Sequence, residues 1–244
     1  MKRTASIFAA SLLMGGVGVS PAFAGPSASG GGAATSGYNS IPSKVTGNVA
    51  SIGFEATQTS EFGDAVALSG RNRTLNSVTV LLSSWACETG AWNGTCQTTP
   101  GATFNVPITF TIYDATGITA LATTVENVAV AYRPSASAQC VGGDAGKWYN
   151  SKDKTCYNGF PQTVTAVMNP TTLPDNVIWS VKYDTYSTNG NVSTPADSLN
   201  VGAFSFPNAP YSGTDLNADE AFRNGAMESG WTGNRPLGAV TTVK

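Results

Sequence analysis

Apolar and polar residues alternate strictly over one stretch near the middle of this chain of 244 residues. Every second residue from Phe104 to Ile112 is apolar, and the residues between them are Asn, Pro or Thr. A period of two is that of a β-strand with one buried face and one face in water. Residues 75–85 (LNSVTVLLSSW) predict a second long strand, and the loop that joins the two contains Cys87 and Cys96. The two strands together predict an all-β domain.

Shorter runs of β-branched and aromatic residues, bounded by Gly, Pro, Asn and Asp, predict further strands. The alternation breaks around Glu126 and Asn127, where a bulge or bend is expected. Only residues 217–222 favour a helix, as a single turn. We therefore expect one antiparallel β-sandwich over residues 38–244, jelly-roll or immunoglobulin-like, with about nine or ten strands. The predicted strands are 49–56, 62–69, 75–85, 104–113, 121–125, 128–132, 164–168, 177–186, 199–206 and 237–243.

The N-terminus has the pattern of a secretory signal peptide. Lys2 and Arg3 precede an apolar run, which is followed by the small-residue site Ala22-Phe23-Ala24. The run is shorter than the roughly 20 residues of a transmembrane helix, and glycines interrupt it. We expect cleavage after Ala24, export by the general secretory route, no membrane span in the mature chain, and a flexible tether over residues 25–37.

Low charge narrows the range of partners. Charged residues are 11% of the chain and the net charge is −2, whereas ordinary domains have roughly 25% charged residues. Nucleic acid and anionic membrane surfaces both require a basic patch, so neither is an expected partner.

The four cysteines, at positions 87, 96, 140 and 156, predict two disulfides in an exported chain. Three pairings are possible, and we favour Cys87–Cys96 and Cys140–Cys156 because they close short loops between strands. The second pair would staple a long loop over residues 135–160. Zinc is the alternative, but the chain has no His and no Cys-x-x-Cys spacing.

Several segments together resemble a family of uncharacterised secreted bacterial proteins that is common in actinobacteria. In that family a Phe-Gly-Asp strand precedes a Ser-Val-Thr-Val strand that ends in Trp-x-Cys, as in residues 55–70 (EATQTSEFGDAVALSG) and 77–87 (SVTVLLSSWAC) here. The resemblance covers nearly all of the mature chain and implies a β-sandwich at the bacterial exterior. It carries over no catalytic residue. The other similar segments are YRPSAS (132–137), KWYNSKDKTCYNGF (147–160), LPDNVIWSVKYDT (173–185), DSLNV (197–201) and GTDLNADEAF (213–222).

The lack of His excludes the Ser-His-Asp and Cys-His nucleophilic systems and His-ligated zinc. A pair of carboxylates, as in glycosidases, is the remaining catalytic hypothesis. Acids in turns more often cap backbone N–H groups or contact water, so we expect a protein that is not an enzyme. The candidate acids are Glu55, Glu61, Asp64, Asp114 and Asp184.

One acidic segment has the spacing of calcium ligands. Asp215, Asn217 and Asp219 lie at i, i+2 and i+4, with Glu220 next to them, but the segment lacks the Gly and the distal Glu of an EF-hand loop. A solvated turn is the alternative. Apart from this structural calcium, no cofactor is expected.

Aromatic residues give the positive indication of binding. Rings on rigid loops can stack on the apolar faces of sugars, although a Trp beside a disulfide often packs on it instead. The sequence thus favours a secreted binding module for an extracellular glycan or cell-envelope polymer. A purely structural matrix protein is the second hypothesis, and a carboxylate-pair glycoside hydrolase is the third. The candidate binding residues are Trp92, Trp148, Tyr149, Tyr157 and Trp231.

Overall fold

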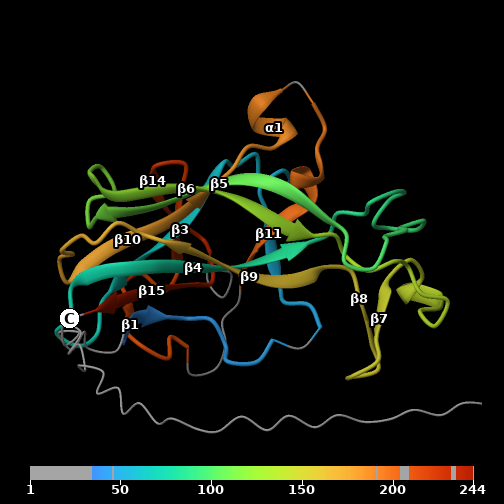
Figure 1. Cartoon of the computed structure of the whole chain (residues 1–244), viewed down its shortest axis with the longest axis horizontal. Coiled ribbons are helices and arrows are strands. Elements are labelled where there is room, and N and C mark those ends of the chain that lie inside the picture. The colour runs from blue at the N-terminus through green and yellow to red at the C-terminus, as the bar shows by residue number, and fades with distance from the viewer. Residues whose placement is uncertain (1–34, 46, 191, 204–208, 232–234, 244) are drawn as a thin grey trace, which may run out of the picture. The chain divides into compact units, whose positions relative to one another are not determined.

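The computed structural model of the protein describes residues 35–45, 47–190, 192–203, 209–231 and 235–243, all of which lie in one compact unit. The expected signal peptide lies outside the described residues. The fold is all-β, as predicted, and two antiparallel sheets pack face to face (Figure 1). Fifteen strands are described, more than the nine or ten expected, because several short strands follow residue 140.

The first sheet is organised around β4, its longest strand. β9 pairs along one side of β4, while β15 and β11 pair with successive parts of the other side. β1 lies beyond β15, and β2 lies beyond β11. The strands of this sheet are β1 (Thr35–Asn39), β2 (Ser51–Gly53), β4 (Thr74–Ser84), β9 (Phe160–Val167), β11 (Leu199–Gly202) and β15 (Gly238–Val243).

The second sheet has the order β14-β13-β3-β10-β5-β6, with β12 also paired to β3. β3 therefore pairs with β10 on one side and with β12 and β13 on the other. The strands of this sheet are β3 (Glu61–Ala67), β5 (Thr103–Asp114), β6 (Ala120–Ala131), β10 (Asn176–Lys182), β12 (Thr214–Asp215), β13 (Glu220–Arg223) and β14 (Ala226–Ser229).

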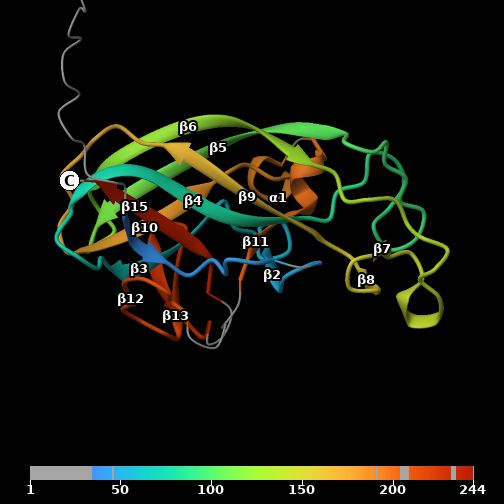
Figure 2. The same ribbon diagram turned by 60° about the horizontal axis from the view of Figure 1, so that its bottom comes forward.

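The remaining elements lie in loops. β7 (Trp148–Asn150) and β8 (Thr155–Tyr157) form a separate hairpin at one end of the sandwich (Figure 2). α1 (Tyr186–Asn189) is one helical turn, and Gly142–Asp144 and Pro195–Ser198 are short 3-10 turns.

The alternation in β5 gives the strand one buried face, as predicted. Its apolar side chains, from Phe104 to Ile112, are all buried in the core between the sheets, and Phe110 has no exposed area. Trp179 of β10 is also fully buried and crosses to the first sheet, where its ring lies against the backbone of Gly238. A Cβ at position 238 would lie 2.5 Å from that ring, so the contact between the sheets requires glycine at this position.

The helical turn expected over residues 217–222 is wrong, because this segment leads into the β13–β14 hairpin. Asn224 and Gly225 form its two-residue turn with φ angles of 48° and 89°. Asn-Gly is the preferred dipeptide for such a turn, since both residues tolerate a left-handed backbone. The local signal for a hairpin therefore prevails over a short helical propensity.

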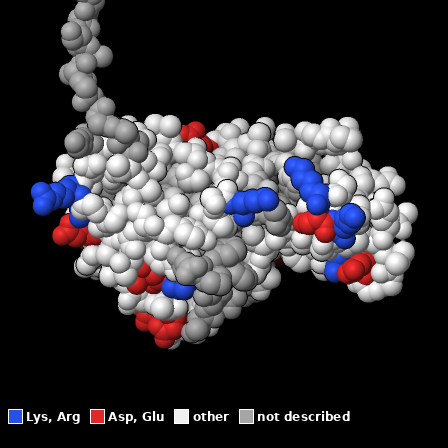
Figure 3. Space-filling view, turned by 90° about the horizontal axis from the view of Figure 1, so that it is seen from below, with Lys and Arg blue, Asp and Glu red and all other residues white. Residues whose placement is uncertain are grey.

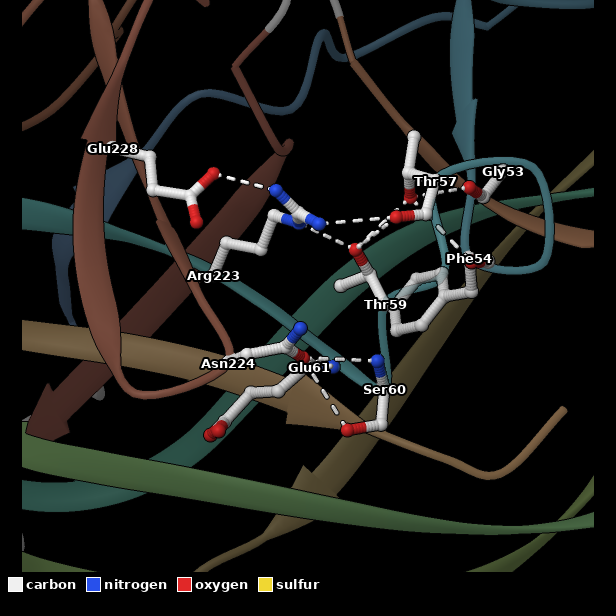
Figure 4. Close-up of polar contacts among 9 residues, drawn as sticks. All are labelled: Gly53, Phe54, Thr57, Thr59, Ser60, Glu61, Arg223, Asn224 and Glu228. Carbon is white, nitrogen blue, oxygen red and sulfur yellow. Dashed lines mark hydrogen bonds and ion pairs between the residues drawn. The ribbon is translucent and has the colours of Figure 1, made fainter. Parts of the chain in front are cut away.

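Polar contacts fix this hairpin to the loop before β3 (Figure 4). Arg223 donates to the Thr59 hydroxyl (2.6 Å) and the Thr57 carbonyl (3.0 Å), and it forms an ion pair with Glu228 at 2.7 Å. The Asn224 side-chain oxygen accepts a hydrogen bond from the Ser60 N–H at 3.0 Å. These contacts bring together segments more than 160 residues apart in sequence.

Several other boundaries differ from the predictions. The strand expected over 177–186 is too long, because β10 ends at Lys182 and α1 begins at Tyr186, and the strand expected over 164–168 begins earlier, at Phe160. β6 is one continuous strand, and the irregularity expected at Glu126-Asn127 lies instead opposite Ile112 and Tyr113 of β5. Only three residues of 49–56 are in a strand, since residues 54–58 form turns. The loop expected over 135–160 contains the β7–β8 hairpin. β1 begins at Thr35, so the expected tether 25–37 is too long by three residues.

Candidate functional site

Both predicted disulfides are confirmed, and they lie at one end of the sandwich. Cys87 pairs with Cys96 in the loop between β4 and β5, and Cys140 pairs with Cys156 in the segment between β6 and β9. We call residues 87–96 the first stapled loop and residues 140–156 the second stapled loop. Both loops extend from strand ends that meet at the end of the sandwich where β7 and β8 are seen (Figures 1 and 2).

Arg133 links the two stapled loops through hydrogen bonds to the backbone of each. Its side chain is fully buried and donates to the backbone carbonyls of Trp92 (2.7 Å), Gly146 (2.8 Å) and Pro134 (3.2 Å). Burial lowers the pKa of the guanidinium to about 10, so it remains charged at neutral pH. Carbonyl dipoles compensate this charge. One side chain therefore sets the position of both loops.

The segment before β5 and the segment after β6 are also hydrogen-bonded to each other, and this pairing extends toward the disulfides. The Tyr132 N–H donates to the Ala102 carbonyl (3.1 Å), and the Ala136 N–H donates to the Cys96 carbonyl (2.9 Å). Between these rungs, the Ser135 hydroxyl accepts from the Thr98 N–H (2.9 Å) and donates to the Thr98 carbonyl (3.1 Å). Residues 97–102 and 132–137 are thus held side by side by hydrogen bonds, and we call these two segments the wall.

A groove lies along this wall. Its larger part has a volume of about 740 Å³. A second, polar and more open part of about 450 Å³ shares the lining residues Thr98 and Ser135 with it. The larger part is lined by Thr98, Pro100, Gly101, Ala102, Ala131, Tyr132, Pro134, Ser135, Ala136, Ser137 and Phe160. The polar part is lined by Glu88, Thr89, Gln97, Thr98, Thr99 and Ser135. We call the two parts together the end groove.

Two partly buried rings face the end groove, and buried rings support both of them. Tyr132 packs on Phe104 with ring centroids 4.8 Å apart, and Phe160 packs on Trp148 at 5.7 Å. The side chain of Gln162 bridges the two sheets beside them, accepting from the Ala131 N–H at 2.9 Å. The aromatic surface of the groove is therefore held in place from behind.

Charged side chains are few on the face of the domain shown in Figure 3, and several gather at the end that carries the β7–β8 hairpin. Within residues 144–154, Lys147 and Asp144 form an ion pair at 2.7 Å. Glu88 is the one charged residue among those that line the end groove. The groove and the neighbouring hairpin therefore differ in chemistry.

The predicted binding aromatics have different environments. Trp92 is 42% exposed and forms a T-shaped contact with Trp85, with ring centroids 5.1 Å apart. Trp148 is only 7% exposed, and its indole N–H donates to the Gly159 carbonyl at 2.9 Å, so its prediction as an exposed platform is wrong. Tyr157 packs against Trp148 at 5.5 Å and donates from its hydroxyl to Asp153 at 2.9 Å.

The other two predicted aromatics do not complete a platform. Tyr149 lies in β7 opposite Cys156 and is partly buried. Trp231 packs on Phe62 of the core at 5.5 Å, away from the stapled loops. The structure thus brings Trp92, Trp148 and Tyr157 to one end and leaves Trp231 elsewhere.

Sequence reasoning missed the residues that shape the end groove, Tyr132, Arg133 and Phe160. A signal was present, because Tyr132 and Phe160 lie where strands meet the two ends of the long segment between β6 and β9. Aromatic residues inside loops attracted attention instead, although strand ends have the more rigid backbone.

The candidate acids occupy separate places. Glu61 and Asp64 are on opposite faces of β3, and Glu61 accepts from Ser180 (2.7 Å) and Tyr113 (2.9 Å) on the outer face. Glu55 accepts from the Ser187 N–H at 2.8 Å. Asp114 accepts from Thr116 within its turn, which lowers its pKa to about 2. Asp184 lines a separate cavity of about 240 Å³.

Asp64 is a fully buried acid in the core. Its Oδ1 accepts from the Ala65 N–H at 2.9 Å, and its Oδ2 has no hydrogen-bond partner within the described parts of the chain. Burial raises the pKa of Asp64 to about 8, although the Arg235 guanidinium and the Tyr38 hydroxyl oppose the shift. The carboxyl group is therefore largely protonated at neutral pH.

The predicted calcium ligands do not fit a calcium site. Asp215 forms an ion pair with Arg235 and also accepts from the Asn217 N–H at 3.0 Å. The Asp219 backbone carbonyl accepts from Trp231. In the segments that the structure covers, no group of three or more His, Cys, Asp or Glu side chains is placed to hold a metal ion. A guanidinium already occupies the position beside Asp215 that a cation would need.

Within the described ranges, no helix has the length and apolar character to cross a bilayer. The resemblance to secreted bacterial sandwiches stays a prediction. The sequence matches no protein-family model, and a search of curated proteins finds none that is significantly similar to it.

Proposed function

We propose that this protein is an extracellular binding module, without a catalytic role, that holds a glycan chain in the end groove. The observation that carries the proposal is the pair of rings, Tyr132 and Phe160, beside the hydroxyls of Thr98, Ser135 and Ser137. A sugar ring has apolar C–H faces and a polar rim. Rings that are held from behind match the faces, and hydroxyls match the rim.

The size and charge of the groove support a sugar ligand. Its larger part, at about 740 Å³, lies within the range of small-molecule sites. In the described parts of the chain, no Lys or Arg lines it, so phosphate groups and nucleic acid meet no cationic side chain from these residues there. Hydroxyl-rich neutral chains need no such partner.

The covalent structure supports an extracellular setting. All four cysteines are paired in disulfides, and disulfides persist in oxidising compartments. The signal-like N-terminus at residues 1–24 adds to this proposal of export.

Retention on insoluble polysaccharides and cell-wall material tests the proposal. Wild-type protein should be retained. Tyr132→Ala should weaken retention at least about tenfold, because stacked aromatic anchors dominate such sites. Ala136→Trp, which fills the groove and removes no core side chain, should weaken it similarly.

Tyr211→Ala is the matched control, because Tyr211 is 49% exposed and is not a lining residue of the end groove. It should leave retention unchanged. Equal retention of the wild type and the three variants would mean that the glycan binds to another face of the domain. Lack of retention of the wild type on any glycan would favour the structural matrix role.

A further inference from the structure

We infer that the glycan in the end groove carries both N-acetyl groups and free amino groups, as in a partly deacetylated glucosamine polymer. This inference rests on the proposed function and names the ligand class of the same site. Glu88 and the apolar lining of the larger part of the groove carry it.

Glu88 is an exposed carboxylate at the polar end of the groove, and one of its oxygens is held by a hydrogen bond. It follows Cys87 directly, and it precedes Thr89, which exchanges two backbone hydrogen bonds of 3.0 Å with Gln97. Its Oε2 accepts from the Thr99 N–H at 2.6 Å. These hydrogen bonds lower the pKa of Glu88, so the group stays ionised in mildly acidic solution.

Among the described residues that line the end groove, no other charged side chain competes with this carboxylate. The nearby guanidinium of Arg133 is buried and is directed at backbone carbonyls. The Lys147 ammonium is paired with Asp144. An anionic sugar would therefore meet unbalanced negative charge at Glu88, while an ammonium group would be complementary to it.

The larger part of the groove offers space for small apolar groups. Ala102, Ala131 and Ala136 line it together with the rings of Tyr132 and Phe160, and their short side chains fill little of its volume. The methyl of an acetamide group is small and apolar, and its amide can bond the hydroxyls of Ser135 or Ser137. A chain with acetamides alone would not use Glu88, and a chain with amines alone would not use the apolar part.

Titration calorimetry with soluble glucosamine oligosaccharides of graded acetylation tests the inference. At about pH 5.5, where amino groups are protonated, wild-type protein should bind partly acetylated chains roughly 2- to 5-fold more tightly than fully acetylated ones, as for an ion pair with an exposed carboxylate. Added salt should reduce this preference.

Glu88→Gln should remove the preference, so that partly and fully acetylated chains bind with similar affinity, because Gln still accepts from the Thr99 N–H but carries no charge. Glu126→Gln on β6, outside the groove, is the matched control and should bind like the wild type. A preference that survives Glu88→Gln, or equal wild-type affinity for acetylated, deacetylated and plain glucose chains, would overturn the inference but leave the proposed function. Failure to bind any chain would overturn both.

Discussion

The two stapled loops each contain one tryptophan, and the two side chains have opposite environments. Trp92 in the first loop is 42% exposed and forms a T-shaped contact with Trp85. Trp148 in the second loop is 7% exposed, packs on Phe160 and has its indole N–H bonded to a carbonyl. The carbonyl of Gly159, just beyond the second loop, accepts from the Trp148 indole N–H, and such a partner lowers the cost of burying the ring.

The difference shows what supports the end groove. The second loop contributes a buried ring behind Phe160, whereas the first loop contributes backbone and the carboxylate of Glu88. Arg133 links the two, because it bonds the carbonyl of Trp92 and that of Gly146. The second loop and Arg133 thus support the groove from behind, and the first loop adds the charge of Glu88 to it.

The largest expected effect is the pH dependence of the unfolding free energy that Asp64 causes in the core of the sandwich. The effects of the loop substitutions can be compared with it. Asp64 has an ordinary pKa of 3.8 and a folded value of about 8. In this interval the folded state keeps a proton that the unfolded state releases, so stability is full below the lower value and falls until the upper one. The loss is up to about 1.4 kcal/mol for each pH unit.

Urea denaturation at a series of pH values measures this loss. Asp64→Asn should remove this contribution and flatten the dependence between the two pKa values. Wild-type and variant curves that run parallel would contradict the burial of an ionisable Asp64.

Removing the buried ring sharpens the comparison between the loops. Trp148→Ala should cost about 3–5 kcal/mol of unfolding free energy, because it leaves a cavity behind Phe160 and an unused carbonyl at Gly159. Trp148→Phe, which keeps an aromatic ring and loses the N–H, should cost less. If thermal and urea melting show no loss for the alanine variant, the second loop does not support the groove.

Arg133 tests whether the two loops behave as one unit. Arg133→Met should cost about 2–4 kcal/mol, since at least two buried carbonyls lose their donor. Hydrogen exchange should rise in both stapled loops, while β5 stays protected. Faster exchange in one loop alone would separate the loops. Arg133→Lys is the matched variant, and its single ammonium should restore only part of the protection.

The smallest effect is expected for Trp92→Ala, with less than about 1 kcal/mol lost, because the ring is already in contact with water. Melting temperature measures this directly. A loss as large as that of Trp148→Ala would remove the difference between the two loops.

The alternation over residues 104–112 and the four cysteines were sufficient to predict the fold class and both disulfides. Each depends on local chemistry, a period of two in the first case and short loop closure in the second. The β13–β14 hairpin was missed, although Asn224-Gly225 is a strong local signal.

The end groove was harder to predict. Tyr132 and Phe160 are 28 positions apart in sequence and meet only because β6 and β9 end at the same place. The burial of Trp148 depends on the Gly159 carbonyl, and no sequence pattern of a loop tryptophan reveals such a partner. Glu88 was not among the candidate acids, because its neighbours Thr98 and Thr99 become relevant only after the disulfide closes the loop.

The central claim is that the end groove is the binding surface, and amide chemical-shift mapping during titration with a partly acetylated glucosamine oligosaccharide tests it most directly. We predict shifts confined to residues 88–89, 97–102, 131–137 and 160, with Trp148 affected only through Phe160. Shifts centred on the outer face of β5 and β6, around Thr109 and Val125, or on the β13–β14 hairpin would contradict the claim, and so would the absence of any shift.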